Sequence, residues 1–73
     1  MTIRLYPRDG WSVIEIDGEL DIQGVPSVRR LRRRAGPRVL FDLRQVTFVD
    51  CSGLRAIVGG APDGSGPTRS ALV

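Results

Sequence analysis

The sequence contains no histidine, lysine or asparagine, and all 11 of its basic residues are arginine. Without histidine there is no Ser-His-Asp or Cys-His catalytic unit and no imidazole ligand for a metal. Without lysine there is no phosphate-binding lysine of a Walker loop and no Schiff base. We therefore expect a protein that is not an enzyme and that uses neither a metal nor another cofactor.

Cysteine and long apolar runs are also scarce. Cys51 is the single cysteine, so neither an internal disulfide nor a thiolate zinc site can form, and nothing indicates secretion. Residues 1–10 lack the apolar run of a signal peptide, and no stretch of the sequence is long enough to span a membrane. We expect a cytoplasmic protein without membrane contact.

The length allows one small domain. The 73 residues are 41% hydrophobic and 26% charged, which is typical of a soluble globular chain. A chain this short buries only a small core, so we expect marginal stability unless a partner or a further segment completes the fold.

Charge is distributed unevenly along the chain. Residues 1–21 contain two arginines and five acidic residues, whereas residues 22–44 contain seven arginines and one acidic residue. A basic block can mark nucleic-acid contact, because arginine displaces counterions from phosphate polymers. However, Val28, Leu31 and Ala35 have the spacing of an apolar helical stripe, and no aromatic residue is interleaved for base stacking. We interpret the block as a solvated helix face and expect no direct contact with nucleic acid.

The first half of the chain predicts a hairpin followed by a βαβ unit. Ile3–Tyr6 and Trp11–Asp17 are strand-like, and residues 7–10 between them have the composition of a turn. Val25–Ala35 is a predicted helix, and Arg38–Leu43 is a third strand. A strand, a helix and a strand in this order imply a parallel crossover, so the predicted sheet is mixed.

A second helix is predicted after an apolar link of residues 46–49. Leu54, Ile57 and Val58 have the i, i+3, i+4 spacing of one helical face. Residues 59–73 are rich in glycine, proline and serine, which is the composition of a flexible tail.

The start of this helix is the candidate site. An oxygen-bearing side chain there accepts N–H bonds from the first turn, so either Asp50 or Ser52 caps the helix, and Gly53 allows a close approach. The functional alternative concerns Ser52. A phosphate on its hydroxyl would meet free N–H groups and the positive end of the helix dipole, so a phosphoserine can be accommodated.

Four segments, in order and with nearly the expected separations, resemble the STAS domain of anti-sigma factor antagonists. They are Gly18-Glu19-Leu20-Asp21, Val25-Pro26 with Val28-Arg29, Val39 to Leu43, and Val46 to Leu54. The resemblance covers about residues 3–58 and implies an α/β fold, with the hairpin and the βαβ crossover in one mixed sheet and the helices on one face.

The resemblance also implies a function. Proteins of this family bind an anti-sigma factor that is a serine kinase and thereby free the sigma factor, which regulates transcription. The kinase phosphorylates the serine that precedes Gly-Leu in the motif, and this breaks the complex. By residue match that serine is Ser52. The preceding position, usually Ser or Thr, is Cys51 in this sequence.

The same match implies which residues contact the partner. Asp21 corresponds to the acidic residue that ends the second strand near the phosphorylated serine, and Asp50 to the acidic residue at the entrance to the site helix. The implied partner-binding residues are Asp21, Asp50, Cys51, Gly53 and Leu54.

The sequence departs from the family after residue 58. The family continues with a strand and commonly a helix, whereas residues 59–73 read as a tail. We therefore expect a partial STAS domain over residues 1–58, with the last strand and helix missing and apolar surface open around Phe41, Leu43 and Ile57. The outcome would be a marginal monomer, a homo-oligomer through the uncovered sheet, or the defective product of a truncated gene.

Three alternatives to the antagonist function stay open. The chain could be a STAS module of another signalling or transport assembly, including one that binds a nucleotide. It could be a non-functional truncated remnant. It could also be an arginine-rich nucleic-acid binder, whose affinity would fall steeply with salt.

Overall fold

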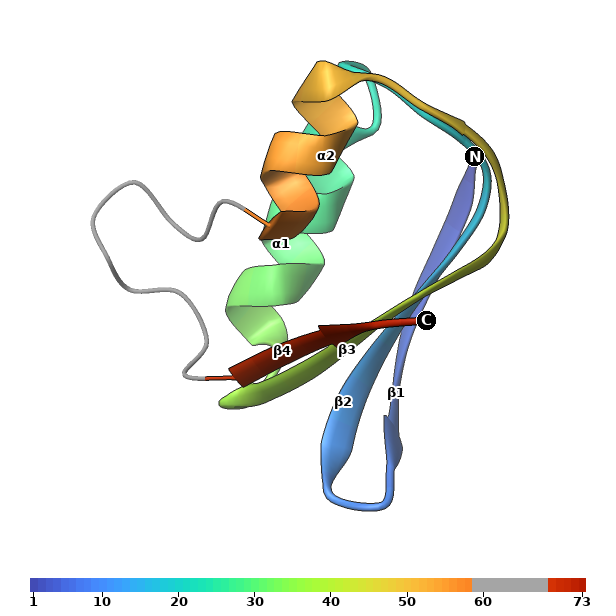
Figure 1. The fold of residues 1–73 in the computed structure, drawn as a ribbon. Coiled ribbons are helices and arrows are strands. Elements are labelled where there is room, and N and C mark those ends of the chain that lie inside the picture. The colour runs from blue at the N-terminus through green and yellow to red at the C-terminus, as the bar shows by residue number, and fades with distance from the viewer. Residues whose placement is uncertain (59–68) are drawn as a thin grey trace.

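The computed structural model describes residues 1–58 and 69–73. In these residues the elements follow the order β1 (Thr2–Arg8), β2 (Trp11–Leu20), α1 (Val25–Arg34), β3 (Arg38–Val49), α2 (Cys51–Val58) and β4 (Arg69–Leu72). The strands form one sheet in the order β1-β2-β3-β4, and α1 and α2 pack on the same face of it (Figure 1). The predicted α/β fold, a mixed sheet built from a hairpin and a βαβ unit, is confirmed.

The β1–β2 hairpin has a shorter turn than the sequence predicted. Pairing extends to Arg8 opposite Trp11, which leaves only Asp9 and Gly10 in the turn, both with positive φ (53° and 83°). This is the two-residue turn whose twist matches that of paired strands. Pro7 therefore lies inside β1, where it is tolerated because β1 is an edge strand.

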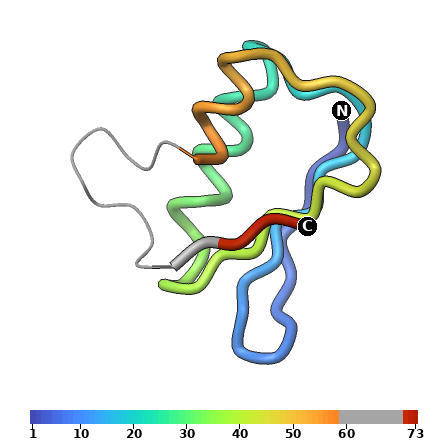
Figure 2. The backbone as a smooth tube through the Cα atoms, viewed as in Figure 1, coloured from blue at the N-terminus to red at the C-terminus, as the bar shows by residue number. Residues whose placement is uncertain are grey.

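β2 and β3 are parallel, and their register shifts after Glu15 and after Gly18. Gly18 has a positive φ of 101°, a conformation that favours glycine. Such irregularities bend paired strands, and Figure 2 shows the ends of β2 and β3 running side by side toward the helices. β3 continues to Val49, so the interpretation of residues 46–49 as a link outside the sheet was wrong. Residues 46–49 are part of the strand because they pair with the end of β2, and the local sequence does not reveal this pairing.

The core lies between the sheet and the two helices. Its buried side chains are Ile14, Ile16, Leu20, Val25, Val28, Val39, Phe41, Ala56 and Ile57. Burial of Val28, with Leu31 and Ala35 packed against the core, confirms the predicted apolar stripe of α1.

Residues 69–72 correct the prediction for the tail. They form β4 in parallel beside β3, and Val73 extends the pairing by donating its N–H to the Phe41 carbonyl and accepting the Leu43 N–H, both at 3.0 Å. The expected lack of the last strand was therefore wrong, as was the expected exposure of Phe41 and Ile57, whose exposed fractions are 0% and 1%. A four-residue strand is too short to show periodicity. The rest of the predicted tail, residues 59–68, lies outside the described residues.

Arg32 corrects the interpretation that every α1 arginine is solvated. It lies four positions after Val28, on the core-facing side of the helix, and its Nη1 donates to the Ala56 carbonyl at 2.8 Å. Its guanidinium also lies over the Phe41 ring, 5.7 Å from the centroid. Burial lowers the pKa of Arg32, and its buried Nε has no hydrogen-bond partner among residues 1–58 and 69–73. Arg32 thus joins α1 to the C-terminal half of α2.

Two ion pairs, Arg4–Glu15 and Arg44–Asp42, join residues of the strands and differ in burial. Arg4 pairs with Glu15 across β1 and β2 at 2.8 Å, and both side chains are substantially solvated. Asp42 differs because it is only 5% exposed. The Arg44 side chain donates to both of its carboxylate oxygens, at 3.0 and 2.8 Å, and the Arg44 N–H donates as well. These hydrogen bonds lower the pKa of Asp42.

We predict that Arg44→Ala lowers stability at neutral pH more than Arg4→Ala does, because it leaves a buried carboxylate without its partner. The folded pKa of Asp42 lies below the unfolded value of about 3.9, so this contribution is present above about pH 4 and is lost as the pH falls through the folded pKa. Urea unfolding across this range should show the two curves, wild type and Arg44→Ala, converging at acid pH. Equal losses from the two variants at pH 7 would contradict the assignment.

Candidate functional site

The start of α2 is capped by Asp50. Its Oδ1 accepts the N–H of Gly53 at 2.8 Å, and its carbonyl accepts the N–H of Leu54 at 2.9 Å. This is the bonding expected of an N-cap aspartate, whose side chain satisfies an N–H of the first turn. Of the two capping residues that the sequence allowed, the structure therefore selects Asp50.

Ser52 is left free by this arrangement. It is the second residue of α2 and is partly exposed, and its hydroxyl makes no hydrogen bond within residues 1–58 and 69–73. The N–H groups of a first helical turn have no partner inside their helix, and they concentrate positive charge there. A hydroxyl at this position can be reached from solvent and can carry a phosphate beside these donors. Cys51, the preceding residue, is exposed and has a free thiol.

Gly53 lets α2 approach the end of β2. A Cβ atom at this position would lie 2.7 Å from the Leu20 carbonyl oxygen and 2.8 Å from Leu20 Cγ. The same carbonyl accepts the N–H of Asp50 at 3.2 Å. The backbone of α2 is thus held against Leu20 with no space for a side chain, which explains why the close approach predicted at Gly53 requires glycine.

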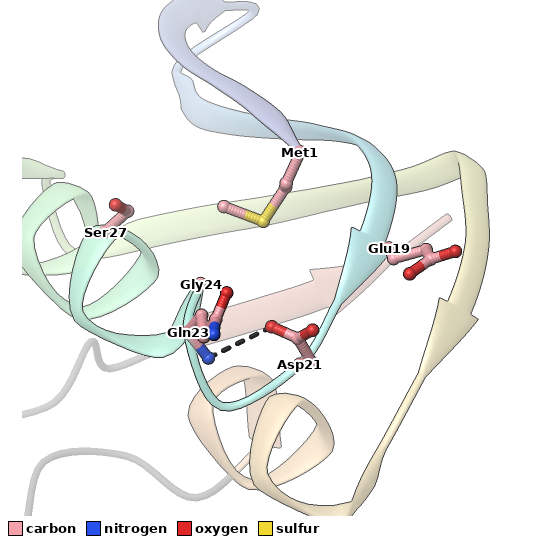
Figure 3. A pocket seen from close by; sticks show the side chains of 6 residues that line it. All are labelled: Met1, Glu19, Asp21, Gln23, Gly24 and Ser27. Carbon is pink, nitrogen blue, oxygen red and sulfur yellow. Dashed lines mark hydrogen bonds between the residues drawn. The ribbon is translucent and has the colours of Figure 1, made fainter.

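Asp21 is brought toward the site by this contact, because it directly follows Leu20. Its carboxylate accepts the N–H of Gln23 at 3.0 Å, which shapes the turn into α1 (Figure 3). It also lines a pocket of about 340 Å³ together with Met1, Glu19, Gln23, Gly24 and Ser27. Ser52 is not part of this lining. Glu19 lies in the same motif as Asp21, whereas no motif in the sequence marks Met1, Gln23, Gly24 or Ser27.

Large apolar side chains are exposed around the same end of the molecule. Ile22 follows β2, Phe48 and Val49 end β3, and Leu54 lies in the second turn of α2; we call these four residues the apolar rim. The exposed fractions of Ile22, Phe48 and Leu54 are 68%, 54% and 49%. Exposed apolar groups of this kind are typical of interaction surfaces.

Sequence reasoning found only one member of the rim. It placed Leu54 at the partner surface by resemblance, but it also predicted Leu54 and Val58 to share an apolar helical face with Ile57. Only Ile57 is buried, whereas Val58 and Leu54 are exposed. Periodicity assigns residues to a face and does not show whether the protein itself covers that face.

In the described part of the chain, neither helix has the length and apolar character needed to cross a membrane.

Comparison with known proteins gives a family and several structures. The family model described as STAS domain matches residues 2–61. Among solved structures, the chain is similar to the anti-sigma factor antagonist SpoIIAA in its unphosphorylated form, with a TM-score of 0.71 and 22% identity over 97% of this chain and 71% of that one. SpoIIAA of Bacillus in the phosphorylated form gives a TM-score of 0.69 and 22% identity, over 94% of this chain and 68% of that one.

A third structure, an anti-sigma factor antagonist from Mycobacterium paratuberculosis, has a TM-score of 0.69 and 23% identity. That match covers 96% of this chain and 66% of the other, so this chain spans about two thirds of the length of the mycobacterial protein. Curated protein sequences give no match. At these identities the structural likeness establishes the fold.

We predict that Gly53→Ala destabilises the protein by about 1–3 kcal/mol, because the new methyl group would overlap the Leu20 carbonyl. Gly36→Ala is the matched control, since a Cβ there would meet nothing closer than 3.6 Å. Its unfolding free energy should stay within about 0.5 kcal/mol of the wild type. Urea unfolding measures both, and a Gly53→Ala variant as stable as the control would refute the close contact.

Proposed function

The chain belongs to the STAS domain family. We propose that it is a cytoplasmic anti-sigma factor antagonist, which binds a kinase-type anti-sigma factor and thereby frees the sigma factor for transcription. The observation that carries the proposal is the free Ser52 hydroxyl. It lies in the first turn of α2, where Asp50 caps the helix, and Leu54 of the apolar rim is exposed two residues further along the same helix. The similarity to SpoIIAA in both phosphorylation forms supports the same role.

The apolar rim supplies the binding energy in this proposal. A partner that covers Phe48, Val49 and Leu54 removes exposed apolar surface from water, which favours association by about 25 cal/mol per Å² of apolar surface buried. Asp21, Asp50 and Cys51 complete the partner surface around the serine, whereas Gly53, predicted as a partner contact, is buried against Leu20 and acts by positioning α2. Because Gly53 and Asp50 hold α2 against Leu20, this surface is formed before the partner arrives, which lowers the entropic cost of binding.

Phosphorylation of Ser52 switches the interaction off. The kinase transfers the γ-phosphoryl group of ATP to the Ser52 oxygen, ADP leaves, and the hydroxyl proton passes to a base of the kinase. The added charge of about −1.5 to −2 lies beside Asp50 and near Asp21. In the free protein the N–H groups at the start of α2 and water stabilise the phosphate. In the complex the phosphate would be desolvated among like charges, so the complex loses more stability than the free protein.

The chain acts as substrate and binding partner in this scheme and not as a catalyst. Each catalytic group belongs to the kinase. The buried core and the addition of β4 to β3 support a folded module over a non-functional remnant.

We predict opposite effects from two substitutions of Ser52. Ser52→Ala should keep binding to the kinase-type anti-sigma factor but accept no phosphate, because the acceptor oxygen is gone. Ser52→Asp should weaken binding at least about tenfold, since it places a permanent negative charge in the interface. Calorimetry with the purified anti-sigma factor and labelled ATP measures both effects.

Thr2→Asp, on exposed β1, is the control for added charge and should bind like the wild type. Undiminished binding by Ser52→Asp, or labelling of Ser52→Ala, would contradict the proposed switch.

We further predict that Leu54→Glu weakens binding to the anti-sigma factor by about tenfold or more, because a charge replaces an apolar contact at the rim. Leu72→Glu is a matched control, since Leu72 is similarly exposed, at 53%, but lies on β4. Calorimetry should separate the two variants while their circular dichroism spectra agree. Equal affinity of the two variants would show that the rim is not the binding surface.

A further inference from the structure

Helix α1 presents a dense group of arginines to solvent. Arg29, Arg30, Arg33 and Arg34 fall within an arc of about 140° around the helix, given 3.6 residues per turn. All four side chains are exposed. We call these four residues the arginine face. None of them makes a hydrogen bond or an ion pair within the described parts of the chain.

The charge of the arginine face is uncompensated. No acidic residue occurs between Asp21 and Asp42, so no carboxylate is available along α1 itself. Arg29 with Arg33, and Arg30 with Arg34, are like-charged pairs at i, i+4, a spacing that destabilises a helix. The dipole at the helix C-terminus favours the last turn only, and Arg29 and Arg30 lie before it. Elsewhere in the chain, Arg4 and Arg44 each have a carboxylate partner.

The surroundings of the arginine face restrict what it can bind. α1 exposes no large apolar side chain. Those that are exposed in the described part of the chain lie at the chain ends, on α2 and at the ends of β2 and β3. A protein interface needs apolar or aromatic anchors at its centre, and a helix embedded in a membrane surface needs an apolar face turned to the lipid. A single strand of nucleic acid needs aromatic side chains for stacking. The arginine face supplies none of these, so its partner must be held by charge.

The backbone of double-helical nucleic acid fits this requirement. It carries one negative charge per about 1.7 Å of helix axis, and guanidinium groups bind phosphate with two parallel hydrogen bonds. α1 lies on the outside of the molecule (Figure 1), and an α-helix with its side chains is about 10–12 Å across, close to the roughly 12 Å width of the major groove. Arginines one turn apart are separated by about 6 Å along the helix axis, so each can reach a different phosphate.

We propose that the arginine face binds double-stranded nucleic acid through its phosphates, without sequence preference. This role departs from the expectation, drawn from the sequence, that these arginines form a solvated helix face with no direct contact to nucleic acid. It is independent of the switch at Ser52, because it uses α1 and none of the residues at the start of α2. A negative result in either test therefore leaves the other unaffected.

The test is fluorescence anisotropy of the full chain with a labelled DNA duplex of about 20 base pairs, titrated at salt concentrations from about 50 to 200 mM. The variant Arg29→Gln/Arg33→Gln removes two charges from the arginine face. Arg4→Gln/Arg8→Gln removes two charges from β1 and is the matched control, since Arg4 and Arg8 are also exposed. Circular dichroism checks that both variants keep the helix content of the wild type.

We expect the affinity of the wild type to fall linearly with salt on a double logarithmic plot. Arg29→Gln/Arg33→Gln should reduce the slope by about 1.8, or about 0.9 for each phosphate that is no longer neutralised. The control should keep the wild-type slope. Equal reductions in both variants would indicate an effect of net charge alone and overturn the proposal. Absent binding at low salt, or binding to vesicles containing phosphatidylserine but not to the duplex, would also overturn it.

Discussion

The architecture depends on one backbone contact, between the end of β2 and the start of α2. The Leu20 carbonyl accepts the N–H of Asp50, and Gly53 packs against Leu20 at a distance that admits no Cβ atom. This contact joins the curved end of the sheet to the helix that carries Ser52. It also places Asp21 and the exposed apolar residues at the same end of the molecule, so the candidate site follows from the packing of three segments that are distant in sequence.

Most of the fold could be predicted because its signals are local. Alternating apolar residues in β2, Pro26 at the start of α1 and the apolar stripe of that helix all report on nearby structure. The errors concern features that pairing decides. The continuation of β3 to Val49 and the addition of β4 depend on a neighbouring strand, and no short window of sequence contains that information.

The candidate site divides in the same way. The cap and the serine could be named from a short motif, and the structure distinguishes them by giving the cap to Asp50. The exposure of Phe48 and Ile22 could not be predicted, because an apolar residue at the end of an element is equally compatible with burial. Arg32 was misread for a related reason. The burial of its guanidinium depends on the Ala56 carbonyl, an acceptor in another helix that the sequence around Arg32 does not reveal.

The bond from Arg32 has a consequence for how α2 can respond to a change at its surface. The helix has only eight residues, yet it is attached at both ends, to Leu20 through Asp50 and to α1 through the Ala56 carbonyl. These two hydrogen bonds oppose rotation and unwinding of the helix. A chemical group added to α2 would therefore change the surface that a partner contacts and not the conformation of the domain. A modification of this helix would be detected by the partner that binds there.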